Sequence, residues 1–386
     1  MKFIDEAIKE SERLEKKMNE NDSNKIASIQ DDEQITNKDE NKLNIYVVGT
    51  GGAGNNTTTR LNQIGIDDVT TIAITTDAQD LYYCQTDEKI LLEYNNRGVS
   101  IHPLSLDEVE DIVNNNENLI KEKLKNADLV FITCGLGGGL GTGSAPIISK
   151  IAKDVGALTI AVVTLPLYSE GFTRRVNAEK GLEKLKNYAD TVIVIPNDKL
   201  LEVAPNLTIS HVFMVIYEII VLTILSMTRL ITTPTLVPLS FEEFRNFFQD
   251  SGMAMMGMGE SDSKERALES AQEALNSPLL DLDVSTTKDA FIIISTSPDI
   301  NLYEAEKIIL AIDDKLNSKA NITWGVYFDD SLENTIRTTI IATGIKHHPI
   351  FIDEDIDDSE NNQEHITLNP LKDIEVWDWT ILMKIK

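Results

Sequence analysis

The sequence predicts an α/β fold: a doubly wound, mostly parallel sheet, a long central helix, and then a smaller α+β domain with flexible tails at both ends of the chain. Three observations lead to this prediction. Apolar strand-like segments alternate with helical ones through the first half of the chain, which is typical of a parallel sheet covered by helices. Two glycine clusters each follow one of these strands. A largely apolar run at 212–227 has Glu218 as its only charged residue, which favours a helix buried on all sides.

The elements follow in order along the chain. The first strand is expected at 43–48, where LNIYVV runs into glycines and then a helix. The other strands predicted for the parallel sheet are 69–75, 128–133, 158–163 and 191–195. The helices between the later strands are predicted at 145–155 and about 174–187, and the central helix at about 209–232. The smaller domain is predicted from helices at 264–276 and 303–316 and strands at 290–295, 321–327 and 336–343.

Charge and cysteine content narrow the class of protein. The 386 residues include 35 basic and 63 acidic ones, a net charge of −28, which would repel a nucleic-acid backbone and argues against nucleic acid as a partner. Two cysteines provide no disulfide framework, and the charged N-terminus does not resemble a signal peptide, so a cytoplasmic protein is expected. The run at 212–227 is shorter than the roughly 20 residues of a membrane span, so no transmembrane helix is expected.

The first glycine cluster fits a dinucleotide-binding fingerprint. Gly49-Thr-Gly51-Gly52-Ala-Gly54 matches G-x-G-x-x-G between a strand and a helix, where backbone N–H groups can meet a phosphate. Asp77 stands at the end of the next predicted strand, where an acid binds the ribose in nicotinamide enzymes. A Rossmann-type NAD-dependent oxidoreductase is therefore one alternative.

The second glycine cluster favours a nucleotide held from two strand ends. The segment 135–143 has six glycines in nine residues, again between strand and helix. So many residues without a Cβ carry a large entropy cost, which a loop wrapping phosphates with its N–H groups can justify. The histidines and cysteines show no metal-ligand spacing, so no metal site in the protein itself is expected.

With these clusters and further motifs, the sequence resembles FtsZ, the prokaryotic cell-division relative of tubulin, and in particular its archaeal branch. The motifs are GGAGNN, GGGLGTGSAP, PLYSEGFTRR, VIPNDKL, MGMGES and NSPLL. They cover about 43–350 and occur in the family's order. The resemblance implies binding of GTP or GDP with Mg²⁺ carried by the nucleotide, and head-to-tail polymerisation into filaments of a division ring at mid-cell.

The resemblance also implies roles for single residues and a division of the chain. The residues expected at the α- and β-phosphates are Gly51, Gly52, Ala53, Gly54 and Asn55, with Gly138, Gly139, Gly141, Thr142 and Gly143 closing around the phosphates. Glu170 and Arg174 are expected near the ribose, although the alternative is an exposed ion pair at a helix start. Asn197 is expected to face the guanine and Phe213 to stack on it. The expected segments are 1–42 (amphipathic arm and polar linker), 43–208 (nucleotide-binding domain), 209–250 (central helix and catalytic-type loop), 251–350 (C-terminal domain) and 351–386 (acidic linker and apolar peptide).

Several positions depart from the family pattern. Tyr217 stands where the family has a guanine-reading aspartate, with Glu218 next to it, and a phenol cannot accept both guanine donors as a carboxylate does. The third phosphate loop, glycine-rich in the family, matches 97–103 here, which has one glycine. Thr75 replaces an asparagine, and Leu140 replaces a threonine. Base specificity is thus open.

The catalytic loop departs most. The family pattern N-x-D-x-x-D positions the attacking water in the pocket of the next subunit, and here Pro238 and Ser240 replace the first two of these residues. Glu243 stands at the second acid and Glu242 beside it, so these two are the candidate catalytic residues. Their alternative role is a solvated helix start, because acids favour the first turn of a helix. The hypothesis is a GTP-binding, assembling protein with weakened hydrolysis; the alternative is a nucleotide-insensitive structural paralogue that co-assembles with an active relative.

The end of the chain predicts a partner. An acidic segment at 353–364 precedes the apolar peptide 372–386, and exposed apolar groups of this number call for something that buries them. In placement this peptide resembles the one with which FtsZ-like proteins dock membrane-anchoring division adaptors. The alternative is a segment packed back on the C-terminal domain.

Overall fold

The structure, a computed structural model, describes residues 43–66, 68–93, 104–203, 208–233, 235, 237–280, 287–317, 319–329 and 331–344. All of these lie in one of the two units of the chain, 1–350. The N-terminal arm and linker (1–42), the third phosphate loop (97–103) and the C-terminal linker and peptide (351–386) lie outside the described residues.

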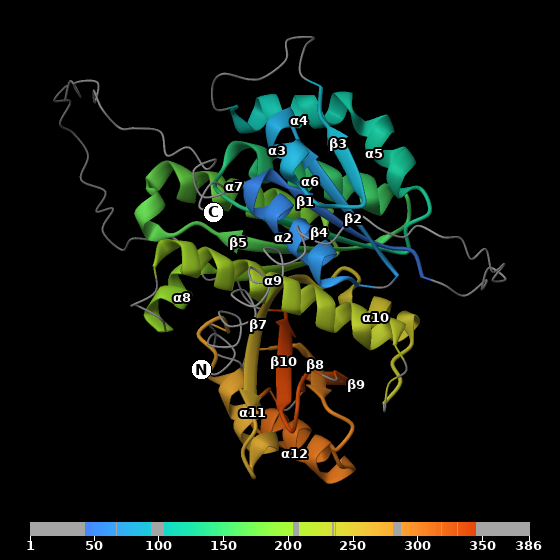
Figure 1. Ribbon diagram of the computed structural model, residues 1–386, viewed down its shortest axis with the longest axis vertical. Coiled ribbons are helices and arrows are strands. Elements are labelled where there is room, and N and C mark those ends of the chain that lie inside the picture. Colours follow the sequence, from blue (N-terminus) through green and yellow to red (C-terminus); the bar gives the residue numbers. More distant parts are fainter. Residues whose placement is uncertain are drawn as a thin grey trace, which may run out of the picture. The chain divides into compact units, whose positions relative to one another are not determined.

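The first part of the fold is a parallel sheet with helices between its strands (Figure 1), as the sequence predicts. Its strands are β1 (Ile45–Thr50), β2 (Val69–Thr75), β3 (Glu88–Leu91), β4 (Leu129–Gly135), β5 (Leu158–Leu165) and β6 (Thr191–Pro196). Its helices are α2 (Gly51–Ile64), α3 (Ala78–Tyr83), α4 (Leu106–Asn115), α5 (Glu117–Leu124), α6 (Gly139–Asp154), the 3-10 turn η1 (Tyr168–Glu170), α7 (Phe172–Tyr188) and α8 (Asn197–Val203). The predicted doubly wound class is confirmed.

The second part joins the same sheet. After α9 (Ile209–Thr232) and α10 (Phe241–Phe248) come β7 (Gly252–Ser261), α11 (Arg266–Leu275), β8 (Asp289–Thr296), α12 (Leu302–Asp313), β9 (Asn321–Phe328) and β10 (Ile336–Thr343). The strand order is β3-β2-β1-β4-β5-β6-β7-β10-β8-β9. Strand β7 pairs in parallel with β6 and antiparallel with β10, so the strands of the smaller domain continue the large sheet, which the sequence did not indicate.

Strand β7 can bridge the two parts because a helix lies directly on it. A Cβ on Gly257 would stand 2.1 Å from the backbone oxygen of Ala274, and one on Gly259 would stand 2.3 Å from that of Ser270. Helix α11 therefore approaches the backbone of β7 without side chains between them. This close approach requires glycine at both positions of the strand.

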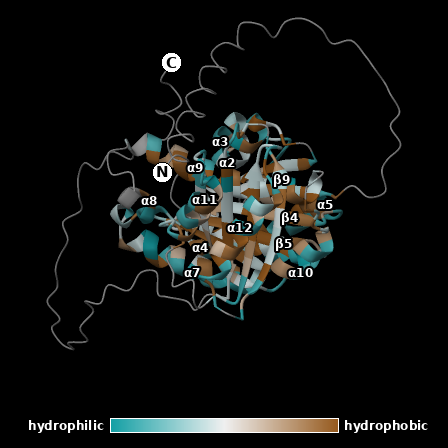
Figure 2. Ribbon diagram, turned by 90° about the horizontal axis from the view of Figure 1, so that it is seen from below, coloured by the Kyte–Doolittle hydropathy of each residue, from teal (hydrophilic) through white to brown (hydrophobic). Residues whose placement is uncertain are grey.

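Helix α9 is the predicted central helix, and it lies between the two parts of the fold (Figure 1). Its apolar residues share one buried cluster with β1, β4, β5, β6, β7 and α10. By length and composition His211–Thr232 could cross a membrane, with a mean hydropathy of 1.9, but 72% of that window is buried inside the protein. The helix thus packs in the core, and Figure 2 shows hydrophobic residues along its neighbours β4 and β5.

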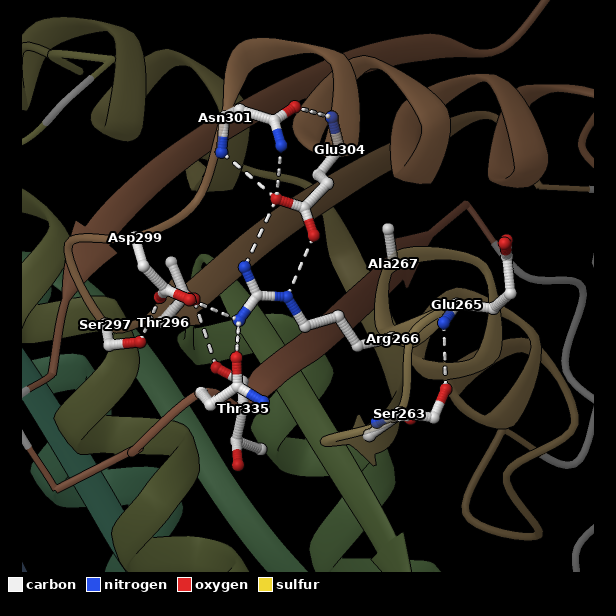
Figure 3. A network of polar contacts seen from close by, with 12 residues as sticks. Ser263, Glu265, Arg266, Ala267, Thr296, Ser297, Asp299, Asn301, Glu304 and Thr335 are labelled. Carbon is white, nitrogen blue, oxygen red and sulfur yellow. Dashed lines mark hydrogen bonds and ion pairs between the residues drawn. The ribbon is translucent and has the colours of Figure 1, made fainter.

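The smaller part is fastened by a buried arginine. The guanidinium of Arg266 donates from Nε and Nη2 to the two carboxylate oxygens of Glu304, at 2.8 and 3.2 Å, and from Nη1 to Asp299 and Asn334, at 2.7 and 3.1 Å. Figure 3 shows these contacts converging on one side chain. Because the partners come from the start of α12 and from two connecting turns, one side chain fixes three segments to the start of α11.

Candidate nucleotide site

The two glycine clusters meet at the carboxyl edge of the sheet. Strands β1 and β4 are parallel neighbours, so the turns after them emerge side by side. Their hydroxyl groups join across the gap, with 2.7 Å between Thr50 Oγ1 and Ser144 Oγ. The backbones also touch, because a Cβ on Gly51 would lie 3.1 Å from the backbone nitrogen of Gly141. The predicted juxtaposition of two glycine turns is therefore present.

Both turns lead into helix N-termini that lack caps. Neither Thr50, before α2, nor Gly138, before α6, makes a side-chain capping hydrogen bond, and neither helix has an acid in its first turn. In contrast, α4, α10 and α12 begin with complete capping boxes. Uncapped N-termini leave N–H donors and a partial positive charge facing outward, an environment that suits phosphate groups.

The glycines of these turns have different surroundings. Around Gly52 and Gly138 a Cβ would meet nothing within 4 Å, so both backbones face open space. A Cβ on Gly54 would lie 2.2 Å from the Thr133 oxygen, and one on Gly139 would lie 2.4 Å from the Leu104 oxygen. Two of the predicted phosphate glycines thus also serve close packing.

Two more predicted residues of the second turn are packed. A Cβ on Gly143 would lie 2.9 Å from the side chain of Val109 in α4. Thr142 is buried, and its hydroxyl accepts a hydrogen bond from the Gly137 N–H at 2.8 Å. Their side-chain positions therefore face the protein, and the backbone N–H groups of α6 are the donors available to a ligand.

Two buried asparagines carry unpaired oxygens at this edge. Asn55, 1% exposed, donates from Nδ2 to Asp80 at 2.8 Å, while its Oδ1 has no partner. Asn197, 4% exposed at the start of α8, also has an Oδ1 without a partner. Buried polar atoms without partners are rare in native proteins and call for an explanation; a polar ligand at the glycine turns provides one. The sequence did not indicate Asp80 as a site residue, because no local pattern links it to Asn55, 25 positions earlier in the chain.

The side chains of α9 face α2 at two places. Asn56 Nδ2 donates to the Tyr217 hydroxyl at 3.3 Å. One residue further, Glu218 forms an ion pair with Arg60 at 3.0 Å, with the two side chains 8% and 14% exposed. Burial raises the pKa of Tyr217, as does the nearby Glu170 carboxylate, although the Asn56 bond lowers it. Tyr217 therefore points to the site and Glu218 to the helix packing. Phe213, one turn before Tyr217, is partly buried against the same core.

Glu170 and Arg174 pair with each other. Glu170 accepts from the Leu167 N–H at 2.8 Å through one oxygen and from Arg174 through the other, at 2.5 Å. The carboxylate and guanidinium are 22% and 49% exposed. The structure thus contains the ion pair at a helix start that the sequence left as the alternative, in a position bordering the site. Whether they contact a ribose stays a prediction.

The catalytic-type loop and α10 lie at the other end of the strands, where β4 begins. Ser240 caps α10, and the Glu243 carboxylate accepts from the Ser240 N–H and hydroxyl at 2.9 and 2.7 Å, which lowers the pKa of Glu243. Glu242 is exposed beside it. Helix α10 contacts the starts of strands: Arg245 donates to the Asp128 oxygen just before β4. In the described residues of one chain, these acids and the glycine turns therefore lie a strand length apart.

Asp77, the residue behind the oxidoreductase alternative, is a helix cap. Its carboxylate accepts from the N–H groups of Gln79 and Asp80 and so begins α3. No group of three or more His, Cys, Asp or Glu that could hold a metal ion occurs in the part of the chain that the structure describes. At the glycine turns, the site thus offers two helix N-termini and the amides of Asn55 and Asn197, with the Glu170–Arg174 pair at its border.

Comparison with known proteins agrees with this geometry. Residues 44–205 match the Tubulin/FtsZ family GTPase domain, and 252–346 match the FtsZ family C-terminal domain. The chain is 52% identical to the cell division protein FtsZ of Methanothermobacter thermautotrophicus, covering 91% of each, and 50% identical to cell division protein FtsZ 1 of Thermococcus kodakarensis, covering 83% of this chain and 85% of the relative. A solved structure titled as an empty FtsZ dimer from M. jannaschii superposes with a TM-score of 0.75 at 43% identity, covering 79% of this chain and 89% of that one. The chain therefore belongs to the FtsZ family, with a tubulin/FtsZ-type GTPase domain followed by an FtsZ C-terminal domain.

Proposed function

We propose that this chain binds GTP across the joined N-termini of α2 and α6 and assembles head to tail with copies of itself, with slow hydrolysis. The observation that carries the binding proposal is the pair of uncapped helix N-termini beside two buried, unpartnered asparagine oxygens. A triphosphate supplies the anion that these termini lack. Mg²⁺ would arrive with the nucleotide.

The predicted residues divide into three groups around such a nucleotide. The phosphates would lie on the backbone N–H groups of 51–55 and 138–143. Glu170 and Arg174 would border the ribose. The base would lie among Asn197, Phe213 and Tyr217.

The distance between the two halves of the site supports assembly. Strand β4 has seven residues, which span roughly 20 Å, and the glycine turns and α10 lie at its opposite ends. No side chain of Glu242 or Glu243 can bridge that length within one chain. A second copy, placed with its α10 edge over the glycine turns of the first, would complete the site, and repetition of this contact gives a filament.

The residues of the loop before α10 and at its start support slow hydrolysis. Positioning the water accounts for most of the catalysis of phosphoryl transfer. Here the Glu243 carboxylate is already bonded to Ser240, and Pro238 and Ser240 offer no carboxylate or amide. With Glu243 bonded to Ser240 and only Glu242 exposed beside it, this loop would orient the attacking water poorly.

Phosphate release and light scattering test the proposal together. The purified chain with GTP, Mg²⁺ and K⁺ should scatter light in a GTP-dependent way and release phosphate slowly, and the double variant Pro238→Asn with Ser240→Asp should release it faster. Brisk, concentration-dependent turnover by the wild type would contradict slow hydrolysis. Assembly that is indifferent to GTP would favour the nucleotide-insensitive paralogue.

Family membership and the sequence of the C-terminal segment support a proposed cellular role. Filaments of this chain would contribute to a division ring in the cytoplasm, and 372–386 would dock a membrane-anchoring adaptor. Deletion of 372–386 should abolish recruitment of the filaments to the membrane in cells and leave GTP binding unchanged. Loss of folding on deletion would instead mean that the peptide packs on the C-terminal domain.

A further inference from the structure

The part of the site next to Tyr217 presents the hydroxyl of a phenol. The phenol lies between Asn56 of α2, which donates to it at 3.3 Å, and Glu170 of η1, which acts on its pKa. Because the phenol oxygen accepts from Asn56, its own O–H remains to donate to a further group. Burial raises the pKa of Tyr217, so the phenol stays neutral at physiological pH.

Glu218, next to Tyr217 in the chain, and Glu170, which acts on the phenol, both already have partners. Glu218 is paired with Arg60 in a buried contact, and removing a charge from such a pair is strongly unfavourable. Both oxygens of Glu170 accept hydrogen bonds, from Leu167 and Arg174.

Guanine, hypoxanthine and xanthine share a 6-oxo group and differ at position 2 of the ring, and xanthine also carries a hydrogen on N3. Guanine carries an amino group there, hypoxanthine a hydrogen and xanthine a carbonyl oxygen. A carboxylate accepts from N1–H and the 2-amino group together and would repel the xanthine oxygen. A phenol accepts one N–H weakly, tolerates the hydrogen, and can donate its O–H to the carbonyl.

We propose that this chain recognises the purine base through the Tyr217 hydroxyl instead of a carboxylate. It therefore binds inosine and xanthosine triphosphates nearly as well as GTP. This inference rests on the proposed nucleotide site. It names the substrate class as 6-oxopurine nucleoside triphosphates, with Tyr217 as the specificity-determining residue.

The expected change in nucleotide affinity distinguishes recognition of the base by a carboxylate from recognition by a phenol. A hydrogen bond to a charged group changes affinity by about 10- to 100-fold, whereas one between neutral groups changes it by only a few-fold. Loss of the 2-amino group should therefore weaken binding to the wild type by less than about tenfold. Introduction of a carboxylate by Tyr217→Asp should raise the discrimination against both analogues by about tenfold or more.

The test is direct binding of GTP, ITP and XTP to the full-length chain, stripped of nucleotide and kept below the concentration at which it scatters light. The variants are Tyr217→Asp, Tyr217→Phe and, as a matched control, Tyr303→Asp, since Tyr303 is 72% exposed on α12, far from the site. Tyr217→Phe should keep GTP and ITP equal within about tenfold and bind XTP less well than the wild type. Tyr303→Asp should leave every ratio unchanged.

The outcomes separate this inference from the function on which it rests. Wild-type affinity for GTP that exceeds the affinity for either ITP or XTP by about tenfold or more overturns the inference and leaves nucleotide binding intact. Undetectable binding of all three nucleotides overturns the proposed function itself. If Tyr217→Asp fails to fold by thermal unfolding, the wild-type ratios and Tyr217→Phe still decide the question.

Discussion

The clearest prediction concerns two glycines, two residues apart, in the first turn of α2. Gly52 is exposed, and a Cβ there would meet nothing within 4 Å. Gly54 is buried, and a Cβ there would stand 2.2 Å from the backbone oxygen of Thr133 in β4. The same change to alanine should therefore act on binding at the first position and on folding at the second.

The magnitudes follow from these surroundings. In Gly54→Ala, α2 must move away from β4 by about 1 Å, and overpacking of this kind costs about 3 kcal/mol. The better helix propensity of alanine offsets about 1 kcal/mol of this, so the free energy of unfolding should fall by about 2 kcal/mol. Gly52→Ala should change the free energy of unfolding by less than about 0.5 kcal/mol. Its methyl group would occupy the space in front of the helix N-terminus and weaken GTP binding at least about tenfold, or 1.4 kcal/mol.

The assay pairs denaturant unfolding without nucleotide with GTP binding measured below the concentration of assembly. Gly52→Ala should unfold with the wild-type midpoint and bind GTP weakly, while Gly54→Ala should unfold at lower denaturant. Wild-type GTP affinity in Gly52→Ala would refute the assignment of phosphate to this turn. Wild-type stability of Gly54→Ala would refute the argument from close packing.

Three further predictions concern stability. Glu218→Leu leaves Arg60 buried without its carboxylate and should lower the free energy of unfolding by about 3 kcal/mol, whereas adding Arg60→Met should restore much of the loss in a double-mutant cycle. Ser240→Ala removes the cap of α10 and should cost about 1 kcal/mol in denaturant unfolding. Hydrogen bonds from Arg266 lower the pKa of Glu304 from its usual 4.5; its contribution is present at neutral pH and is lost as pH falls through the lowered pKa. Below pH 4.5, the wild type should therefore lose stability more steeply than Arg266→Met, and equal slopes would contradict this role of the ion pair.

The parts of the fold that the sequence predicted are those with local signals. Strands such as β4 and β5 are mostly apolar runs rich in β-branched residues and bounded by glycine or by helical segments, and such runs predict buried parallel strands. Both glycine turns are visible as clusters. Their neighbouring positions follow from the rule that parallel strands end at the same edge.

The strands and side-chain contacts that the sequence did not predict either have no local sequence pattern or depend on residues far away in the chain. Strand β7 has the sequence GMAMMGMGES, which contains no β-branched residue, and its pairing with β6 and β10 is set by long-range contacts rather than by propensity. Strand β3 has four residues, too few for a periodic pattern. The orientation of Tyr217 toward Asn56 and of Glu218 toward Arg60 depends on contacts with α2 more than 150 positions away, which no single-sequence pattern reports.

Helix α9 relates the nucleotide edge to the C-terminal part of the fold through direct packing. Near its start, Tyr217 and Glu218 contact α2, the helix that begins at the first glycine turn. Near its end, Arg229 pairs with Asp329 at 2.9 Å, just after β9. Close by, a Cβ on Gly325 of β9 would lie 2.6 Å from the Leu230 side chain. Packing this tight leaves no room for α9 and β9 to slide past each other, so α2 and the edge strand β9 are held in register by one buried helix.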